Sequence, residues 1–315
     1  MSRTDPAMRI HLNIGGHHRD LDTIRADAES AATDGLAGVW MSQIFGPDAL
    51  TALAVIGQDV TGLELGVSIV PIYGRHPLAL AMQARTVQAA VDGRLTLGIG
   101  PSHQMVVELL YGESYARPYT GTEEYLAALQ PLLAGAAADV VGEEITARGR
   151  LEIDAPAPPP VLLAGLGPKM LRLAGRETSG TALWMVGPRT IAEHVAPTIS
   201  KAAGDAGRPA PRILAGVTAV VTDDADAARE RAASEQAIYG TLPAYRHMLD
   251  AEGVDGPADL VIAGTEDVVA EGLGRYAEAG ATDVRVTVLA GDDDERDRTR
   301  ALLTALNRPP TVNQE

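Results

Sequence analysis

The sequence predicts a (β/α)8 barrel, a fold in which parallel strands alternate with helices around a closed sheet. Apolar strand-like segments recur eight times along the 315 residues, and most of them are followed by a segment with helical periodicity. The strand-like segments show almost no alternation of polar and apolar residues, as expected when helices cover a parallel sheet. An open doubly wound sheet is the alternative, because the same rhythm of strand and helix also builds that fold.

Residues 63–103 contain the clearest unit of this rhythm. Residues 65–70 and 95–99 are apolar runs, and the segment between them carries apolar residues at intervals of three and four. That spacing places the apolar side chains on one face of a helix. The helix is predicted to end at Asp92-Gly93, where glycine can adopt the left-handed conformation that often closes a helix.

The remaining elements follow the same pattern. The other strands are predicted at residues 9–15, 38–43, 161–164, 182–186, 213–221 and 283–289. Further helices are predicted at residues 21–34, 49–60, 121–133, 169–176, 187–203, 225–251, 266–280 and 294–306. Asp48 precedes one of these helices, where its carboxylate can accept hydrogen bonds from the exposed amides of the first turn.

The chain is predicted to form one domain, from residue 9 to residue 315, after a flexible tail of residues 1–8. The rhythm breaks between about residues 104 and 160, where a hairpin near residues 139–153 is followed by the proline-rich connector 155–160. A proline-rich run can mark a domain boundary, but strands and helices alternate again after it. We therefore interpret residues 104–160 as an excursion from a single barrel.

Composition argues against several classes of function. Charged residues make up 22% and apolar residues 46%, which is typical of a globular chain. A formal net charge of −16 argues against nucleic acid and anionic membranes as partners. The chain has no cysteine, so disulfides and thiolate metal ligands are excluded. No apolar stretch approaches the roughly 18 residues that cross a membrane, and no signal peptide is visible, so we expect a soluble cytoplasmic protein.

Common catalytic and nucleotide-binding motifs are missing from the sequence. His103 stands where G-x-G-x-x-G requires its third glycine, and the chain has no P-loop, G-x-S-x-G or H-E-x-x-H motif. The seven histidines are scattered except for His17-His18, which we interpret as part of a solvated loop. We therefore predict no metal site.

Three phrases of the sequence resemble a known family. They are IVPIYGRHPLALAMQA, DGRLTLGIGPSH and LLAGLGPKMLRLAGR, in this order along the chain. Together they resemble the bacterial luciferase-like superfamily of flavin and deazaflavin oxidoreductases, and specifically its branch that uses coenzyme F420. The resemblance extends from Arg9 onward and implies a luciferase-like (β/α)8 barrel with insertions.

The resemblance also implies where the cofactor binds. In this family the cofactor lies across the carboxyl ends of the strands, and the third strand carries a bulge with a non-prolyl cis peptide behind the deazaflavin ring. The matching residues are Ser68 and Ile69. Two loops resemble those that contact the ribityl chain and the phosphate in relatives. Their residues are Gly98, Gly100, Pro101, Ser102 and His103 in the first loop and Gly165, Leu166, Gly167, Pro168 and Lys169 in the second.

The chemistry of these loops suits an anion. Glycine lets the backbone approach a ligand closely, and a hydroxyl, an imidazole or the free amides at a helix start can donate to phosphate. Lys169 adds a positive charge, and Arg75 and Arg189 are further candidates for contact with the acidic tail of F420. The same residues also suit tight turns and a helix cap, and the two interpretations are compatible.

The sequence departs from the family pattern at the end of the second strand. Some relatives place an acidic residue and a histidine there, with the histidine as general base, and the matching positions here are Gln43 and Ile44. Gln43 can hold the polar edge of the ring by hydrogen bonds, but neither residue can take a proton. Alcohol oxidation by that route is therefore not expected. The candidate catalytic residues for supplying a proton are His11 and His103.

We therefore expect an F420-dependent oxidoreductase that transfers a hydride between C5 of the deazaflavin and a small or medium organic substrate. The expected reaction is reduction of an activated C=C or C=N bond. Two alternatives stay open, an FMN-dependent monooxygenase with a separate reductase and a barrel that binds flavin or a metabolite without catalysis. Relatives are commonly dimers, so a homodimer is expected. Tyr239 and Tyr245 lie in a region that often covers such pockets, although core packing is their expected role.

Overall fold

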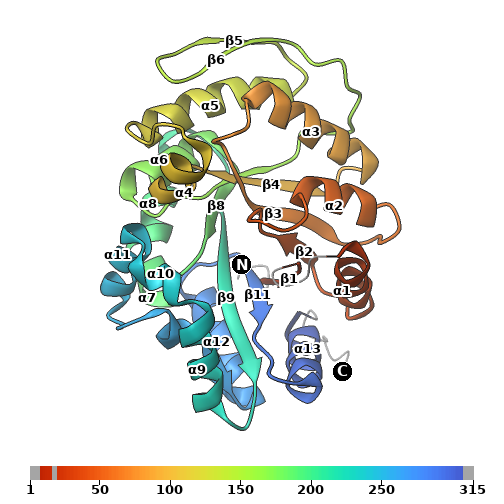
Figure 1. Cartoon of the computed structure of the whole chain (residues 1–315), viewed down its shortest axis with the longest axis vertical. Helices are drawn as coiled ribbons and strands as arrows, with labels where there is room; N and C mark the ends of the chain where they lie inside the picture. The colour runs from red at the N-terminus through yellow and green to blue at the C-terminus, as the bar shows by residue number, and fades with distance from the viewer. Residues whose placement is uncertain (1–7, 16–19, 308–315) are drawn as a thin grey trace, which may run out of the picture.

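The computed structural model describes residues 8–15 and 20–307. Within these residues, eight parallel strands close into a barrel surrounded by helices, as the sequence predicts (Figure 1). In their order around the barrel, the strands are β1 (Arg9–Asn13), β2 (Gly38–Met41), β3 (Glu64–Pro71), β4 (Leu95–Gly100), β7 (Val161–Leu163), β8 (Gly180–Leu183), β9 (Arg212–Val221) and β11 (Asp283–Val288). Because β11 pairs with β1 and β8 also pairs with β9, the sheet is closed and the open doubly wound alternative is excluded.

Helices connect the strands on the outside of the barrel (Figure 1). Those between the first four strands are α1 (Leu21–Thr33), α2 (Ala49–Ile56) and α3 (Pro77–Ala90). Later in the chain come α5 (Pro118–Leu133), α6 (Pro168–Glu177), α7 (Pro188–Thr190), the π-helical turn η2 (Ile191–Val195), α8 (Ala196–Asp205), α9 (Ala225–Glu235), α10 (Ala237–Thr241), α11 (Pro243–Glu252), α12 (Glu266–Glu278) and α13 (Asp293–Asn307). Among the described residues, no helix combines the length and the apolar character required to span a membrane.

Local sequence explains where the first helices begin and end. The carboxylates of Asp20 and Asp48 each accept a backbone N–H from the first turn of the following helix, at 2.8 Å and 2.9 Å respectively. Pro77 begins α3, and the chain leaves that helix through Asp92 and Gly93, whose φ angles are 51° and 79°. The predicted cap at Asp48 and the predicted helix end at Asp92-Gly93 are confirmed.

The strand predicted at residues 182–186 is shifted in the structure. It begins at Gly180 and ends at Leu183, where its pairing with β9 also ends. Met185 has a φ of 57°, a value outside the extended range, so the strand cannot continue through it. Trp184 therefore stands in the loop that follows β8.

The long helix predicted at residues 225–251 is divided into α9, α10 and α11. Pro243 begins α11 and keeps Leu242 extended, because the proline ring disfavours a helical conformation at the residue before it. The apolar residues near 259–263 belong to a 3-10 turn, η3 (Pro257–Leu260), and to the short strand β10 (Ile262–Gly264). β10 extends the sheet by pairing with the end of β9.

The excursion between β4 and β7 begins with a helical segment that the sequence pattern did not predict. α4 (Gln104–Val106) continues into the π-helical turn η1 (Val107–Tyr111), directly after the loop that follows β4. After α5, strands β5 (Ala138–Val141) and β6 (Thr146–Gly149) form the predicted hairpin. The hairpin lies on the outside of α3 and α5 (Figure 1). The chain then returns to the barrel at β7.

Side chains fill the barrel interior in layers, as is usual for this fold. In the middle layer, Trp40 is fully buried in a cluster with Leu162, Ala182 and Leu214. Gly66 makes room for the indole, because a Cβ at this position would lie 2.1 Å from the Trp40 ring. One added methyl group would therefore displace the largest side chain in the barrel interior.

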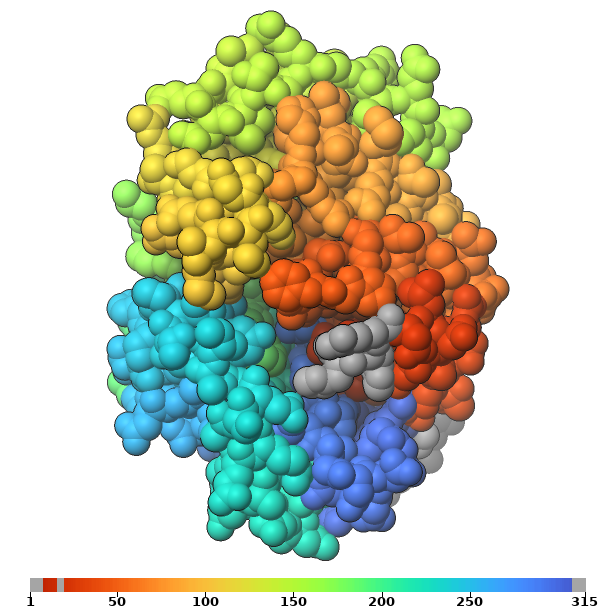
Figure 2. All heavy atoms as spheres, in the orientation of Figure 1, coloured from red at the N-terminus to blue at the C-terminus, as the bar shows by residue number. Residues whose placement is uncertain are grey.

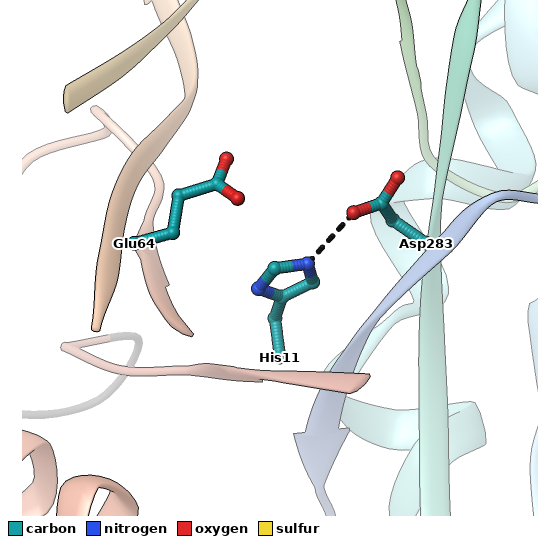
Figure 3. Close-up of side chains that lie close together, drawn as sticks. All are labelled: His11, Glu64 and Asp283. Carbon is teal, nitrogen blue, oxygen red and sulfur yellow. Dashed lines mark hydrogen bonds and ion pairs between the residues drawn. The ribbon is translucent and has the colours of Figure 1, made fainter. Parts of the chain in front are cut away.

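Charged side chains fill the layer at the amino-terminal end of the barrel. We call this layer the barrel floor, and it consists of His11, Glu64, Arg212 and Asp283. Arg212 donates to Glu64 Oε1 and to Asp283 Oδ1, each at 2.8 Å. The imidazole of His11 lies between the two carboxylates, 2.9 Å from Asp283 Oδ1 (Figure 3). The four residues come from the starts of β3, β9 and β11 and from the middle of β1, so the floor joins four strands.

The distances in the barrel floor would allow a metal ion, since ligand atoms of His11, Glu64 and Asp283 lie within 4.8 Å of one another. However, Arg212 and Arg9 form ion pairs with both carboxylates. Two guanidinium groups balance the two carboxylate charges, and a metal ion would have to displace them. We therefore interpret the barrel floor as an ion-pair network.

The network keeps its carboxylates charged although they are buried. Burial alone would raise the pKa of Asp283, but the hydrogen bond to His11 and the charge of Arg212 hold it well below its usual range. Burial alone would also raise the pKa of Glu64. The charges of Arg212 and His11 outweigh this effect, so that the pKa of Glu64 is lowered. Because both pKa values are lower in the folded chain, both carboxylates stabilise the fold above their ordinary pKa values. That stabilisation is lost as the pH falls through the folded-state values.

We expect Asp283→Asn to lower the free energy of unfolding at neutral pH by about 3 kcal/mol, because it leaves Arg212 beside a neutral amide. The stability of the unaltered chain should fall as the pH is lowered from about 5 to about 2, and the variant should lose part of that dependence. Urea unfolding followed by circular dichroism measures both. Asp226→Asn is the control, because Asp226 is 92% exposed beside Arg229. Equal effects of the two substitutions would contradict the role of the barrel floor.

Candidate active site at the carboxyl ends of the strands

A pocket of about 1360 Å³ opens at the carboxyl-terminal end of the barrel. Its walls are residues that follow the barrel strands, together with residues of η1, α9, α10 and α11. Figure 2 shows the surface hollowed between the cyan helices α9 and α10 and the orange segment after β2. The pocket is larger than a typical site for one drug-sized molecule, so it can hold a large cofactor together with a substrate.

The structure brings together nearly all of the predicted cofactor-binding residues. Those that line the pocket are Gln43, Ser68, Ile69, Gly100, Pro101, Ser102, His103, Gly165, Leu166, Gly167, Pro168 and Lys169. They lie in the later part of β3, at the end of β4 or in the segments after β2, β4 and β7. These four strands are neighbours in the barrel, so residues far apart in the sequence meet at one edge. Their contact with a cofactor stays a prediction.

The peptide bond between Ser68 and Ile69 is cis, as the family resemblance implies. The pairing of β3 with β4 shifts register between Val67 and Val70, so this bond lies in a bulge of β3. Ser42, which follows β2, donates a hydrogen bond from its Oγ to the carbonyl oxygen of Ser68 at 2.9 Å. The bulge presents Ser68 and Ile69 to the pocket.

Gly98 lies behind this bulge and is not among the residues that line the pocket. A Cβ at Gly98 would be 2.1 Å from the carbonyl oxygen of Val67 and 3.3 Å from Cγ2 of Ile69. A backbone carbonyl cannot turn aside as a flexible side chain can, so glycine is required for β4 to lie this close to the bulge. Gly98 therefore supports the bulge from behind, and its contact with the cofactor stays a prediction.

Two loops on the β4 and β7 side of the pocket are suited to an anion. In the first loop, Ser102 has a φ of 60°, and its carbonyl accepts a hydrogen bond from the Tyr115 hydroxyl at 3.1 Å. In the second, Gly167 precedes α6 without a side-chain cap, and Lys169 lies in the first turn of that helix. The amides of this turn and the lysine can therefore donate to a phosphate.

Gln43 lines the pocket and also caps a helix. Its Oε1 accepts a hydrogen bond from the backbone N–H of Ala49 at 2.8 Å, at the start of α2. This hydrogen bond holds the side-chain amide in place, and its Nε2 can donate to a ligand. Ile44 is 55% exposed at the rim of the pocket. Neither side chain can act as the base that alcohol oxidation requires.

His103 begins a row of rings along one wall of the pocket. Its imidazole centroid lies 5.1 Å from the ring of Tyr245. The Tyr239 ring lies 5.5 Å from Tyr245 and 5.8 Å from Trp184. Burial lowers the pKa of His103 and raises the pKa values of Tyr239 and Tyr245. At neutral pH the imidazole is therefore mostly uncharged and both phenols are protonated. The two tyrosines, for which core packing was expected, face the pocket.

His11, the other candidate for proton supply, is not brought to the pocket. It is fully buried in the barrel floor, with the Trp40 ring 5.8 Å away in the next layer. His11 lies in the middle of β1, opposite Gly38, the first residue of β2. Asn13, two residues further along β1, reaches the pocket, as does Leu12.

Arg75 and Arg189, the further candidates for the tail of the cofactor, also lie outside the pocket. Arg75 forms an ion pair with Asp48. Arg189 is 59% exposed and pairs with Glu193 one helical turn away. Both are charges near the surface with partners of their own. His17-His18 fall outside the described residues.

The sequence analysis missed the polar centre of the pocket, which is formed by Arg285, Asn13 and Ser42. Arg285 Nη1 donates to Asn13 Oδ1 at 2.5 Å and to Ser42 Oγ at 3.0 Å. Its guanidinium carbon lies 5.4 Å from the centroid of the Trp184 ring. Burial lowers the pKa of Arg285 to about 10, so the side chain stays charged at neutral pH. The polar residue at every second position of DVRVTV is the signal that could have identified it.

A closed barrel with a bulged third strand and a large pocket at the carboxyl ends defines a class of barrel enzymes that work with a bound cofactor. Comparison with known families makes the class specific. The family described as luciferase-like monooxygenase matches residues 7–295. The chain therefore belongs to the luciferase-like monooxygenase family, and it is an oxidoreductase barrel of that type.

Individual relatives agree with this assignment. The chain is 27% identical over 239 residues to the 5,10-methylenetetrahydromethanopterin reductase of Methanolobus tindarius, which covers 75% of this chain and 73% of that protein. It is 27% identical over 243 residues to the F420-dependent hydroxymycolic acid dehydrogenase of Mycobacterium tuberculosis, which covers 71% and 66%. The fold is similar to that of an F420-dependent secondary alcohol dehydrogenase in complex with an F420-acetone adduct, with a TM-score of 0.82 and 18% identity over 96% of this chain and 100% of that one.

We expect Gly98→Ala to lower the free energy of unfolding by about 2 kcal/mol, because the added methyl group would press against the carbonyl of Val67. Gly204→Ala is the matched control, since a Cβ at Gly204 meets no atom within 4 Å and alanine favours helix α8. Thermal and urea unfolding of both variants measure the difference. If Gly98→Ala were as stable as the control, β4 and the bulge would not be as tightly packed as described.

Proposed function

We propose that the protein is an F420-dependent oxidoreductase that reduces an activated C=C or C=N bond of a small or medium organic molecule. The observation that carries this proposal is one cavity faced by the Ser68-Ile69 bulge, by two loops that are suited to an anion and by a wall of protonated rings. The names of the relatives support it, since one is an F420-dependent enzyme and another is a reductase.

The residues present fit a deazaflavin that carries a phosphate. The first turn of α6 and Lys169 would hold the phosphate, and the bulge at Ser68 and Ile69 would support the ring. The loop before α6 is held close, because a Cβ at Gly165 would lie 2.3 Å from Cγ of Met170. When F420 is bound and reduced, it supplies a hydride from C5.

Reduction suits the polar groups of the pocket better than alcohol oxidation does. Gln43 and Ile44 offer no base for removing the proton of an alcohol. A reduction needs a proton donor instead, and His103 and Tyr245 both carry a proton at neutral pH, on a ring nitrogen and on the phenol oxygen. Either residue can protonate the substrate from the wall of the pocket.

The rim of the pocket indicates that the substrate has an apolar part. Phe45, Leu110 and Met105 line the opening and are 79%, 59% and 48% exposed. Exposed apolar side chains that gather around one opening are typical of a binding surface. We propose a substrate whose activated bond enters the pocket and whose apolar part lies against these side chains.

Titration of the protein with oxidised F420 and separately with FMN tests the cofactor. FMN ends at its phosphate, whereas F420 continues into an acidic tail, and we expect F420 to bind more tightly. The reverse preference would favour a monooxygenase, and binding of neither would overturn the cofactor assignment. Turnover of an enoyl or imine acceptor with reduced F420 would then exclude a barrel that binds without catalysis.

We expect Lys169→Gln to weaken F420 binding about fivefold, which corresponds to about 1 kcal/mol for one exposed charge contact. Binding of the same deazaflavin without its phosphate and tail should not change. Lys201→Gln is the matched control, because the sequence has only these two lysines and Lys201 is 75% exposed beside Asp205 on α8. If the two variants bound F420 equally well, Lys169 would not belong to the phosphate site.

We expect His103→Asn to lower the turnover number about 100-fold, the usual loss when a general acid is removed. Single-turnover kinetics with prebound reduced F420 measures this loss separately from cofactor binding. Tyr245→Phe is the comparison, because it removes the neighbouring donor and keeps the ring. A larger loss in Tyr245→Phe than in His103→Asn would transfer the role of proton donor to the tyrosine.

A further inference from the structure

The charge of Arg285 is the feature of the pocket that the proposed function leaves unused. The residue is 4% exposed, and a buried charge is unfavourable unless an opposite charge or strong hydrogen bonds compensate for it. Asn13 and Ser42, its hydrogen-bond partners, are neutral. Its Nε is buried and has no hydrogen-bond partner in the described chain. Within residues 8–15 and 20–307, no carboxylate forms an ion pair with it.

Two other arginines of the pocket wall have carboxylate partners. Arg300 forms an ion pair with Asp34, and Arg296 forms one with Asp293. Their charges are therefore balanced within the chain. Arg285 combines the deepest burial with the absence of a paired carboxylate in the described residues, so the missing negative charge is one that a ligand can supply.

Arg285 lies across the pocket from the two anion-binding loops. It belongs to β11, between β1 and β9, whereas the loops follow β4 and β7. The bulge of β3 stands between them, and Ser42 connects the two parts by bonding both Arg285 and the carbonyl of Ser68. A cofactor that extends from the bulge to the loops therefore leaves the β11 side of the pocket for the substrate.

We propose that Arg285 binds the carboxylate of an α,β-unsaturated carboxylic acid and that this is the substrate class of the enzyme. The proposal rests on the proposed function and specifies its substrate. A guanidinium is the side chain best suited to a carboxylate, because it presents several charged N–H donors in one plane, and Arg285 lines the pocket. The rings of Trp184 and Tyr239 line the same part of the pocket and exclude water, which strengthens a charged hydrogen bond.

Reduction of such an acid requires one hydride, which reduced F420 would supply, and one proton, which His103 or Tyr245 would supply. The hydride forms a new C–H bond at the β carbon, the π bond breaks, and its electron pair moves to the α carbon and the carboxylate. A proton from His103 or Tyr245 forms the second C–H bond at the α carbon, which gives the saturated acid. Arg285 stabilises the negative charge that grows on the carboxylate and exchanges no proton.

The test compares an acid with its neutral amide. We expect 2-hexenoate to bind at least about tenfold more tightly than 2-hexenamide, because one charge-assisted hydrogen bond accounts for a factor of that size. Trp184 lies beside Arg285 and reports binding through its fluorescence, whereas Trp40, the other tryptophan, is buried inside the barrel. Loss of the signal in Trp184→Phe confirms its source. This comparison needs no change to Arg285 and no catalytic activity.

Substitutions of Arg285 test whether this residue is the one that binds the carboxylate. Arg285→Gln should abolish the preference for the acid, and Arg285→Lys should retain part of it, because a charge remains without the planar guanidinium. Arg296→Gln is the matched control, since Arg296 already pairs with Asp293 and is 49% exposed. A preference for the acid that persisted in Arg285→Gln would place the anion elsewhere and overturn the proposal.

The outcome is independent of the cofactor test. Equal binding of acid and amide by a protein that binds F420 would overturn the carboxylate site and leave the proposed function intact. Preferential binding of the acid by a protein that does not bind F420 would support the site and overturn the cofactor. With F420 bound, 2-hexenoate should also be reduced faster than 2-hexenamide, and equal rates would exclude the acid as the substrate class.

Discussion

The ion pairs of Arg212 in the barrel floor are the interaction on which the rest of the structure depends. Strands on opposite sides of a barrel share no backbone hydrogen bonds, so the interior side chains hold them at the correct separation. Arg212 on β9 reaches Glu64 on β3 and Asp283 on β11. The floor therefore fixes the relative positions of β3, β9 and β11 at their amino-terminal ends. The positions of the residues at the carboxyl ends of the same strands depend on this arrangement.

Above the floor, glycines on the strands leave the space that the large tryptophan rings occupy. Gly66 leaves space for the Trp40 ring, which separates the floor from the pocket. Gly216 on β9 does the same one layer higher, because a Cβ there would lie 2.6 Å from the Trp184 ring and 2.9 Å from Nη2 of Arg285. The polar centre of the pocket thus depends on a residue that contributes no side chain to it.

The closed barrel could be predicted from the sequence because a strand covered on both faces leaves a continuous apolar run. The bulge at Ser68-Ile69 could be predicted only through the resemblance to a family, since a small polar residue in an apolar strand has many structural roles. The level at which each polar residue lies along the barrel axis, in the floor or at the pocket, could not be predicted. His11 and Asn13 are two residues apart on β1, yet one lies in the floor and the other reaches the pocket. The sequence pattern does not contain the pairing register that separates them.

The barrel floor also closes one end of the barrel. Charged side chains and the Trp40 ring close the barrel beneath the pocket, so a compound bound beside Arg285 is in a chamber that opens at the carboxyl face. Phe45 and Leu110 lie on the wall of this pocket and are exposed to solvent. The floor thus keeps the far end of the barrel closed, and a ligand of the pocket contacts residues of the carboxyl face only.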